Sequence, residues 1–334
     1  MTESNPGALA ALRRTVTERF AVPSTPRAVY QLVNTLAVYV GCWMAALWSL
    51  DVSYLLTLLF IVPLAGASVR LFIFQHDCGH GSFLPSQRWN DIVGSVLGVV
   101  TVTPYHYWRR THASHHATSG NLDRRGMGDI DTLTVEEYKA LAPAKRLAYR
   151  LYRNPVVLLG FGAFFHFVVF HRWPTNMPPS WKTERRGVLF TNLGLALLVG
   201  VLCWAVGWER FLLVQVPTTA VSCAFGVWLF YVQHQFEDAY WRPATSWSFE
   251  EAGLDGSSYY RMPRVMQWFT GNIGIHHVHH LSSRIPNYRL EKAMRETPEL
   301  QRPVELSLLS SLRCASLKLW DERTGRLVRF KDVA

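Results

Sequence analysis

The fold of this chain is decided by residues 89–120, WNDIVGSVLGVVTVTPYHYWRRTHASHHATSG. Here an apolar run leads into three histidines, His112, His115 and His116, at positions i, i+3 and i+4. On a helix, that spacing places all three side chains on one face. A solvated surface has no need for three imidazoles within one turn, so the stretch predicts a helix that binds metal.

Two further histidine groups lie far away in the sequence and repeat this helical spacing. The candidate ligands are His76 and His80 in HDCGH, and His276, His279 and His280 in GIHHVHH. Imidazole is a common ligand for zinc, copper, iron and nickel. Eight imidazoles exceed the coordination shell of one ion, whereas a zinc site needs three or four ligands and a haem one or two. The count predicts two metal ions, with iron favoured over copper because soft ligands are few near the histidines.

The composition points to a membrane protein. Hydrophobic residues make up 49% of the 334 residues and charged residues only 17%, whereas about 25% charged residues is usual in soluble proteins. The formal net charge is +10. Because the basic residues flank apolar segments and form no separate module, nucleic acid is not an expected partner. The five cysteines suggest no disulfide framework, and we expect reduced thiols.

Four segments are apolar over about the 20 residues that a helix needs to cross a bilayer. The predicted spans are residues 28–50, 52–75, 188–207 and 211–233. Only a few residues join the first span to the second and the third to the fourth, so each pair is expected to form a helical hairpin. The predicted fold class is therefore all-α integral membrane, with four transmembrane helices as two hairpins, interfacial helices and a cytosolic cap.

The basic residues predict the orientation of this multi-pass protein. They gather before the first span and between the second and third spans, whereas the hairpin tips hold only Asp51 and the pair Glu209–Arg210. By the positive-inside rule, residues 1–27, the middle segment and the C-terminal tail 291–334 face the cytoplasm. The shorter apolar segments Ile92–Pro104 and Pro155–His171 are interpreted as interfacial or re-entrant helices. The alternative for Pro155–His171 is a fifth span.

Over residues 28–290 the chain resembles the membrane fatty-acid desaturases, specifically the acyl-lipid omega/Δ12 type of bacteria and plastids. The resemblance is carried by HDCGH, WRRTHASHHATSGNLDRRGMGDIDTLTVEEY, YVQHQFEDAYW and GNIGIHHVHHLSSRIPNYRL. It implies a non-haem di-iron centre held by three histidine boxes, 76–80, 112–116 and 276–280, and by one further histidine. The implied ligands are His76, His80, His112, His115, His116, His234, His276, His279 and His280.

Polar residues close to the boxes are candidates to hold the ligands in place. They are Asp77, Glu237, Asp238 and Asn272, with Asp129 and Asp131 as further candidates to orient a histidine. The alternative for each is a surface charge or a helix cap. His106 and His277 lie outside the matched spacing, and His166 and His171 are interpreted as structural or surface residues.

The resemblance implies an oxygen-dependent desaturase that places a cis double bond in a long acyl chain, of the Δ12/omega-6 type on an acyl lipid. Two electrons come from an external donor, for which ferredoxin is expected and cytochrome b5 is the alternative. The nearest rival functions on the same scaffold are an acyl-chain hydroxylase and a carotenoid hydroxylase or ketolase. A metal or proton transporter is a more distant alternative, because the four spans are almost free of charge and the histidines lie at one end.

Overall fold

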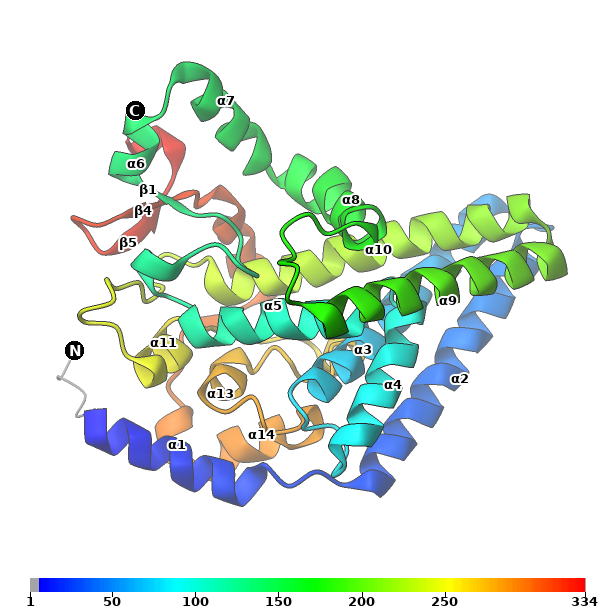
Figure 1. Cartoon of the computed structure of the whole chain (residues 1–334), viewed down its shortest axis with the longest axis horizontal. Helices are drawn as coiled ribbons and strands as arrows, with labels where there is room; N and C mark the ends of the chain where they lie inside the picture. The colour runs from blue at the N-terminus through cyan, green and yellow to red at the C-terminus, as the bar shows by residue number, and fades with distance from the viewer. Residues whose placement is uncertain (1–5, 334) are drawn as a thin grey trace.

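Residues 6–333 are described by a computed structural model (Figure 1). Within them, four helices are long and apolar enough to cross a membrane. These are α2 (Thr25–Ser49), α3 (Tyr54–Gly79), α9 (Lys182–Val206) and α10 (Trp208–His234). They form two hairpins, and Arg210 joins the two hairpin tips by donating to both carboxylate oxygens of Asp51, at 2.6 and 2.9 Å. The predicted fold class is confirmed.

The helices extend further than the apolar segments at the ends that approach the histidines. Helix α3 continues to Gly79, so that His76 lies in its last turn. Helix α9 begins at Lys182, ahead of the apolar run, with Glu184 in its first turn. Hydropathy marks only the part of a helix that lipid surrounds, whereas the backbone hydrogen bonds continue beyond it. This continuation places His76 of the first histidine box in a membrane helix, with His80 directly after the end of the helix.

Shorter helices lie beside the long ones. Helix α4 (Gln87–Val100) contains most of the first short apolar segment and, with 14 residues, is too short to cross a bilayer. The second consists of a π-helical segment, η2 (Val156–Gly162), then α8 (Ala163–Val168) and the single turn η3 (Phe170–Arg172). The run from Val156 to Arg172 meets α7 (Pro143–Tyr152) at 68°. Such a bend is compatible with a re-entrant or interfacial element, which stays a prediction.

The cap combines short helices with two small sheets (Figure 1). Strand β1 (Leu133–Thr134) pairs in parallel with β4 (Leu319–Asp321), which pairs antiparallel with β5 (Arg326–Val328). Strand β2 (Tyr259–Tyr260) pairs in parallel with β3 (Glu305–Leu306). The sequence did not predict these strands, which are too short to show a period. The division of the chain at residue 290 stays a prediction, although strands beyond it pair with strands before it.

The remaining elements complete the cap and its connections to the membrane helices. They are α1 (Pro6–Phe20), α5 (Tyr105–Thr118), η1 (Leu122–Arg124), α6 (Val135–Ala140), α11 (Phe249–Asp255), α12 (Arg264–Phe269), α13 (His276–Leu281), α14 (Asn287–Glu296), η4 (Pro298–Leu300), α15 (Leu308–Ser311), η5 (Leu312–Ser316) and η6 (Phe330–Asp332). Helix α1 buries Val16 and Phe20 in one apolar cluster with Val278 and Leu281 of α13. In addition, the Thr17 hydroxyl of α1 contacts the hydroxyl of Ser282, the residue that follows α13, at 2.8 Å.

A close approach between α4 and α5 fixes the start of the second histidine helix. Gly94 on α4 lies against the ring of Tyr105, with no room for a Cβ atom between them. The buried Tyr105 hydroxyl donates to the Cys78 carbonyl and contacts Asp91 Oδ1, both at 2.9 Å. The tyrosine thus connects α4, α5 and the end of α3, and the missing side chain at position 94 makes this possible.

Gly94→Ala should therefore lower the free energy of unfolding by about 1–3 kcal/mol, because a buried and hydrogen-bonded ring must move. Thermal unfolding in detergent, followed by circular dichroism, measures this change. Gly41→Ala on α2 is the matched control, since nothing lies within 4 Å of the added Cβ atom there. Equal unfolding temperatures for the two variants would contradict this account of the α4–α5 contact.

Candidate metal centre

The nine histidines predicted as ligands converge where α3 and α10 end. His76 lies in the last turn of α3 and His80 just after it, while His234 is the last residue of α10. The other six come from two short helices: His112, His115 and His116 from α5, and His276, His279 and His280 from α13. Four separate elements thus deliver imidazoles to one place.

The first group contains His76, His80, His112, His116 and His279. One ring nitrogen of each lies within 4.8 Å of the corresponding nitrogens of the others. The Nε2 atom of His116 lies 3.1 Å from Nε2 of His112 and 3.1 Å from Nε2 of His279. All three boxes contribute to this group.

The second group contains His115, His234 and His280, again with ligand nitrogens within 4.8 Å of one another. His115 Nε2 lies 3.2 Å from His234 Nε2, which lies 3.0 Å from His276 Nε2. His276 therefore adjoins this group. Helix α5 serves both groups, and the stacked rings of His116 and His280, with centroids 4.1 Å apart, form the boundary between them.

A carboxylate contacts the His76 ring through the Nδ1 atom. Its Nδ1 atom lies 3.1 Å from Asp77 Oδ1, and the other oxygen of Asp77 accepts from the backbone and side-chain nitrogens of Asn287, at 2.7 and 2.8 Å. Hydrogen bonds of this kind fix the orientation of a ligating histidine and its tautomer. The structure thus places Asp77 in contact with a predicted ligand, and it adds Asn287 of α14, which the sequence reasoning missed.

Two histidines of the second group have similar hydrogen-bond partners. His115 Nδ1 lies 2.5 Å from Asp129 Oδ1, and His234 Nδ1 lies 3.1 Å from the Gly256 carbonyl oxygen. A carbonyl oxygen only accepts, so Nδ1 of His234 carries the proton that it donates. A neutral His234 then has its lone pair on Nε2, which faces the group.

The protonation state of the rings outside the spans follows from their surroundings. Burial, and then repulsion from neighbouring histidines, lowers the pKa of His80, His112 and His116 well below the ordinary value. The same causes lower the pKa of His279 and His280. These rings are therefore neutral near pH 7, and each offers the lone pair that a metal ion requires.

The residues present fit transition-metal ions. Nitrogens that bind one such ion at about 2.1 Å lie about 3 Å apart when they are neighbours, as the converging Nε2 atoms do. The Nε2 atoms of His80 and His280 are buried and have no hydrogen-bond partner among the described residues. Buried polar atoms normally have partners, so these orphaned nitrogens indicate that a ligand completes the site.

Comparison with known proteins identifies the family. A family model described as "Fatty acid desaturase" matches residues 53–307. A Bacillus subtilis (strain 168) protein named "Fatty acid desaturase" is 46% identical over 314 residues, which cover 94% of this chain and 89% of that protein. The chain belongs to the fatty acid desaturase family. The resemblance that the sequence motifs indicated is confirmed.

More distant relatives of this desaturase carry more specific names. The "sn-1 oleoyl-lipid 12-desaturase" of Synechocystis sp. (strain ATCC 27184 / PCC 6803 / Kazusa) is 29% identical over 66% of this chain and 62% of that protein. The "sn-1 acyl-lipid omega-3 desaturase (ferredoxin)" of the same organism is 28% identical over 87% of this chain and 80% of that protein.

Three of the predicted supporting residues do not contact the histidines of the desaturase. Glu237 and Asp238 are exposed and form ion pairs with Arg326, at 3.7 and 3.0 Å. They follow the end of α10, where the chain has left the helix and turned to the surface. Asn272 has a φ of 59°, a left-handed conformation that asparagine tolerates. Its backbone shapes the turn before α13, and its carbonyl accepts from the Ile275 N–H at 3.0 Å.

The histidines that the sequence analysis left out lie elsewhere. His277 is on α13 but turns away from the two groups, and its Nε2 donates to the Leu300 carbonyl at 3.0 Å. His166 and His171 lie side by side in α8 and η3, with ring centroids 4.6 Å apart. Neither His106 nor these three contributes to the two candidate metal-binding groups found among the described residues.

The sequence reasoning missed a buried arginine close to the second histidine group. Arg153 is 0% exposed. Its guanidinium donates to the Gln235 side-chain oxygen at 2.7 Å, to the Asp131 carbonyl at 2.8 Å and to the Tyr231 hydroxyl at 3.2 Å. Gln235 directly follows the predicted ligand His234, so the arginine ties α7 and the middle segment to the end of α10. In the sequence it is one basic residue among several and carries no distinguishing signal.

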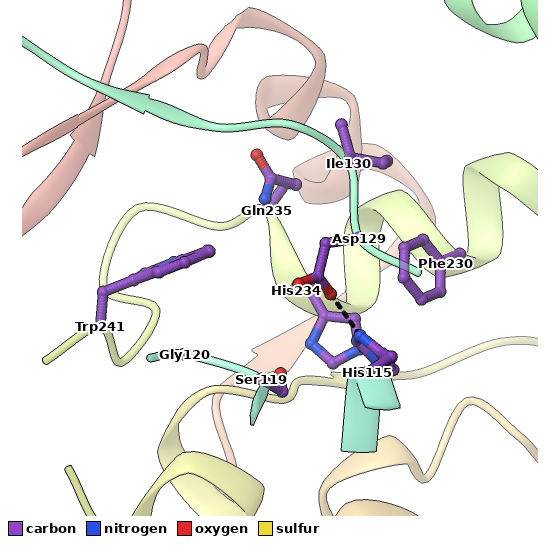
Figure 2. Close-up of a pocket in the computed structure, with 9 residues that line it drawn as sticks. All are labelled: His115, Ser119, Gly120, Asp129, Ile130, Phe230, His234, Gln235 and Trp241. Carbon is purple, nitrogen blue, oxygen red and sulfur yellow. Dashed lines mark hydrogen bonds and ion pairs between the residues drawn. The ribbon is translucent and has the colours of Figure 1, made fainter. Parts of the chain in front are cut away.

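A small cavity borders the second group (Figure 2). Its volume is about 20 Å³, and its lining includes His115, Asp129, His234 and Gln235. Figure 2 shows the Asp129 carboxylate directed at the His115 ring from one side of this space. A cavity of this size has room for about one water molecule. The two histidines beside it, His115 and His234, are themselves buried.

Arg153→Met should lower the free energy of unfolding by on the order of 3 kcal/mol, because several buried acceptors lose a charged donor together. Chemical or thermal unfolding of the purified protein measures the loss. Arg313→Met is the control, because Arg313 is exposed and its side chain has no partner among residues 6–333. If Arg153→Met were as stable as Arg313→Met, the buried arginine would not hold the cap to α10.

Proposed function

We propose that the chain is an oxygen-dependent acyl-lipid desaturase of the Δ12/omega-6 type that uses two iron ions. The observation that carries the proposal is the convergence of nine histidines from four helical elements at the end of the membrane helices. The proposed iron ligands are His76, His80, His112, His115, His116, His234, His276, His279 and His280.

The printed names of relatives support an acyl lipid as the substrate class. One relative is named an oleoyl-lipid 12-desaturase, and others are named acyl-lipid omega-3 desaturases. The four apolar helices support the same substrate, because a chain already in the bilayer can reach a site at the end of those helices. We propose that the new double bond is placed at position 12. The names of the relatives make the omega-3 position the main alternative.

The proposed desaturation consumes one O₂ and two electrons for each double bond formed. Two adjacent methylenes lose one hydrogen each and become a cis double bond, while one O₂, two electrons and two protons complete the formation of two water molecules. Bound iron would supply oxygen activation and the removal of hydrogen from the unactivated chain. The donor proposed is ferredoxin, which two relatives carry in their names; cytochrome b5 is the alternative.

The protein itself contributes position and protection. Asp77, Asp129 and the Gly256 carbonyl hold ring nitrogens from behind, so that the opposite nitrogens face the centre. The burial of these rings keeps bulk water away from a reactive site. Basic residues around the spans support a cytoplasmic position for the centre, where a soluble electron donor is accessible.

Expression in a host whose lipids contain only saturated and monounsaturated chains tests the activity. We expect new dienoic chains, with the second double bond at position 12, when the lipids are analysed by mass spectrometry with double-bond localisation. Hydroxylated acyl chains, or oxidised carotenoids in a host that makes them, would instead support the rival oxidations. A diene with its new bond at the omega-3 position would retain the desaturase and refute the Δ12 assignment.

The ligand assignment is tested by replacing one histidine at a time. His112→Ala, His115→Ala and His279→Ala should each abolish the new double bond and lower the iron content from close to two per chain. His277→Gln is the control on α13, because His277 points away from both groups, and it should keep iron and product. Iron measured by mass spectrometry on purified protein gives the answer. Full activity in all three alanine variants, or a single zinc per chain, would refute the assignment.

A further inference from the structure

An apolar groove lies between the N-terminal ends of α2 and α4, and the mechanism does not use it. Its volume is about 340 Å³, within the range of sites that bind small ligands. Leu32 on α2 forms one wall, and Trp89 and Val93 on α4 form the other, with Phe83 between the two helices. The groove is large enough to hold part of an acyl chain.

The inner wall of the groove belongs to the segment that follows the first histidine box. Phe83 lies three residues beyond His80, and its ring stacks on Phe74 of α3, with centroids 5.0 Å apart and an angle of 19° between the planes. Ser82 donates to the Asp77 carbonyl at 3.1 Å. A ligand against Phe83 would therefore lie next to the chain segment that carries His76 and His80.

The outer side of the groove continues into the membrane-facing surface. Val29 lines the groove and is itself 48% exposed. The exposed residues Val33, Val40 and Met44 continue from it along the same face of α2. On α4, Trp89 is exposed in the same manner. Exposed apolar surface of this extent marks a contact with a membrane or a partner, and because α2 is one of the candidate membrane spans, it favours an opening toward lipid.

The charges near the groove favour an anionic headgroup. Arg27 and Arg88 lie in the first turns of the two flanking helices, and both are exposed. Neither forms an ion pair with a carboxylate of the described residues, whereas the nearby Arg109 pairs with Asp91. Arginine beside an interfacial tryptophan is the arrangement expected at the level of lipid phosphates.

We propose that this groove is the site where a membrane glycerophospholipid docks, with one acyl chain in the groove and its phosphate near the two arginines. The inference rests on the proposed function, because it makes this lipid the substrate of the desaturase. The chain would enter sideways from the bilayer and lie against Phe83, whose ring stacks on Phe74 of α3, next to the segment that carries His76 and His80.

Photo-crosslinking of the full chain tests the docking site without using activity. The probe is phosphatidylglycerol with a diazirine in one acyl chain, placed in nanodiscs with the purified protein. We expect adducts concentrated in residues 28–32 and 83–93, with competition from unlabelled oleoyl phosphatidylglycerol. The double variant Arg27→Gln with Arg88→Gln should remove the preference for phosphatidylglycerol over phosphatidylcholine. Adducts spread evenly along all lipid-facing helices would overturn the proposal.

Filling the groove tests whether the docked lipid is the substrate. Leu32→Trp should weaken the adduct and lower kcat/KM by about tenfold or more, because even one methylene too many in an apolar pocket costs about tenfold, and the iron content should stay unchanged. Val40→Trp is the matched control on the same face of α2, outside the groove, and should alter neither. An adduct lost without any change in kcat/KM would show a structural lipid and overturn the inference. A wild-type protein that makes no unsaturated product would instead refute the proposed function, whatever the adduct map.

Discussion

The structure depends on bringing nine imidazole rings together at the end of the membrane helices, with most neighbouring rings edge-on or tilted to one another. Each ring loses hydration, and any proton on one ring is repelled by the others, which is why the pKa values of His112, His116 and His280 are lowered. Such an arrangement has no favourable hydrogen-bonding pattern of its own, because nitrogens with lone pairs point at one another. It is stable only if rigid elements impose it, or if a bound cation completes it.

The surrounding elements provide that rigidity. The ends of two membrane helices deliver His76 and His234, and hydrogen bonds to Asp77 and Gly256 fix their rings. Helix α13 shares an apolar cluster with α1, in which Val16 and Phe20 of α1 are buried together with Val278. The membrane hairpins and the cap thus each fix some of the histidines. The buried Arg153 connects the cap to the end of α10, next to His234, through hydrogen bonds to Gln235 and to the Asp131 carbonyl.

The sequence predicted the features that follow from local pattern. Long apolar segments gave the four helices, and the i, i+3, i+4 spacing gave the helical faces of the boxes. The split into two groups could not be predicted, because it depends on how the rings of α5 turn: His112 and His116 face one group and His115 the other. Glu237 and Asp238 were misjudged because proximity to His234 in sequence says nothing about direction once the helix has ended. Asn287 and Arg153 act from distant segments, which only the fold brings together.

The central claim is that the chain provides two coordination sites built almost entirely from imidazole. X-ray absorption at the iron edge of the purified, iron-loaded protein tests this most directly. We expect a first shell dominated by nitrogen, with the multiple-scattering pattern of several imidazole rings per iron. A shell dominated by carboxylate oxygen or by sulfur, or one with a single imidazole per iron, would contradict it.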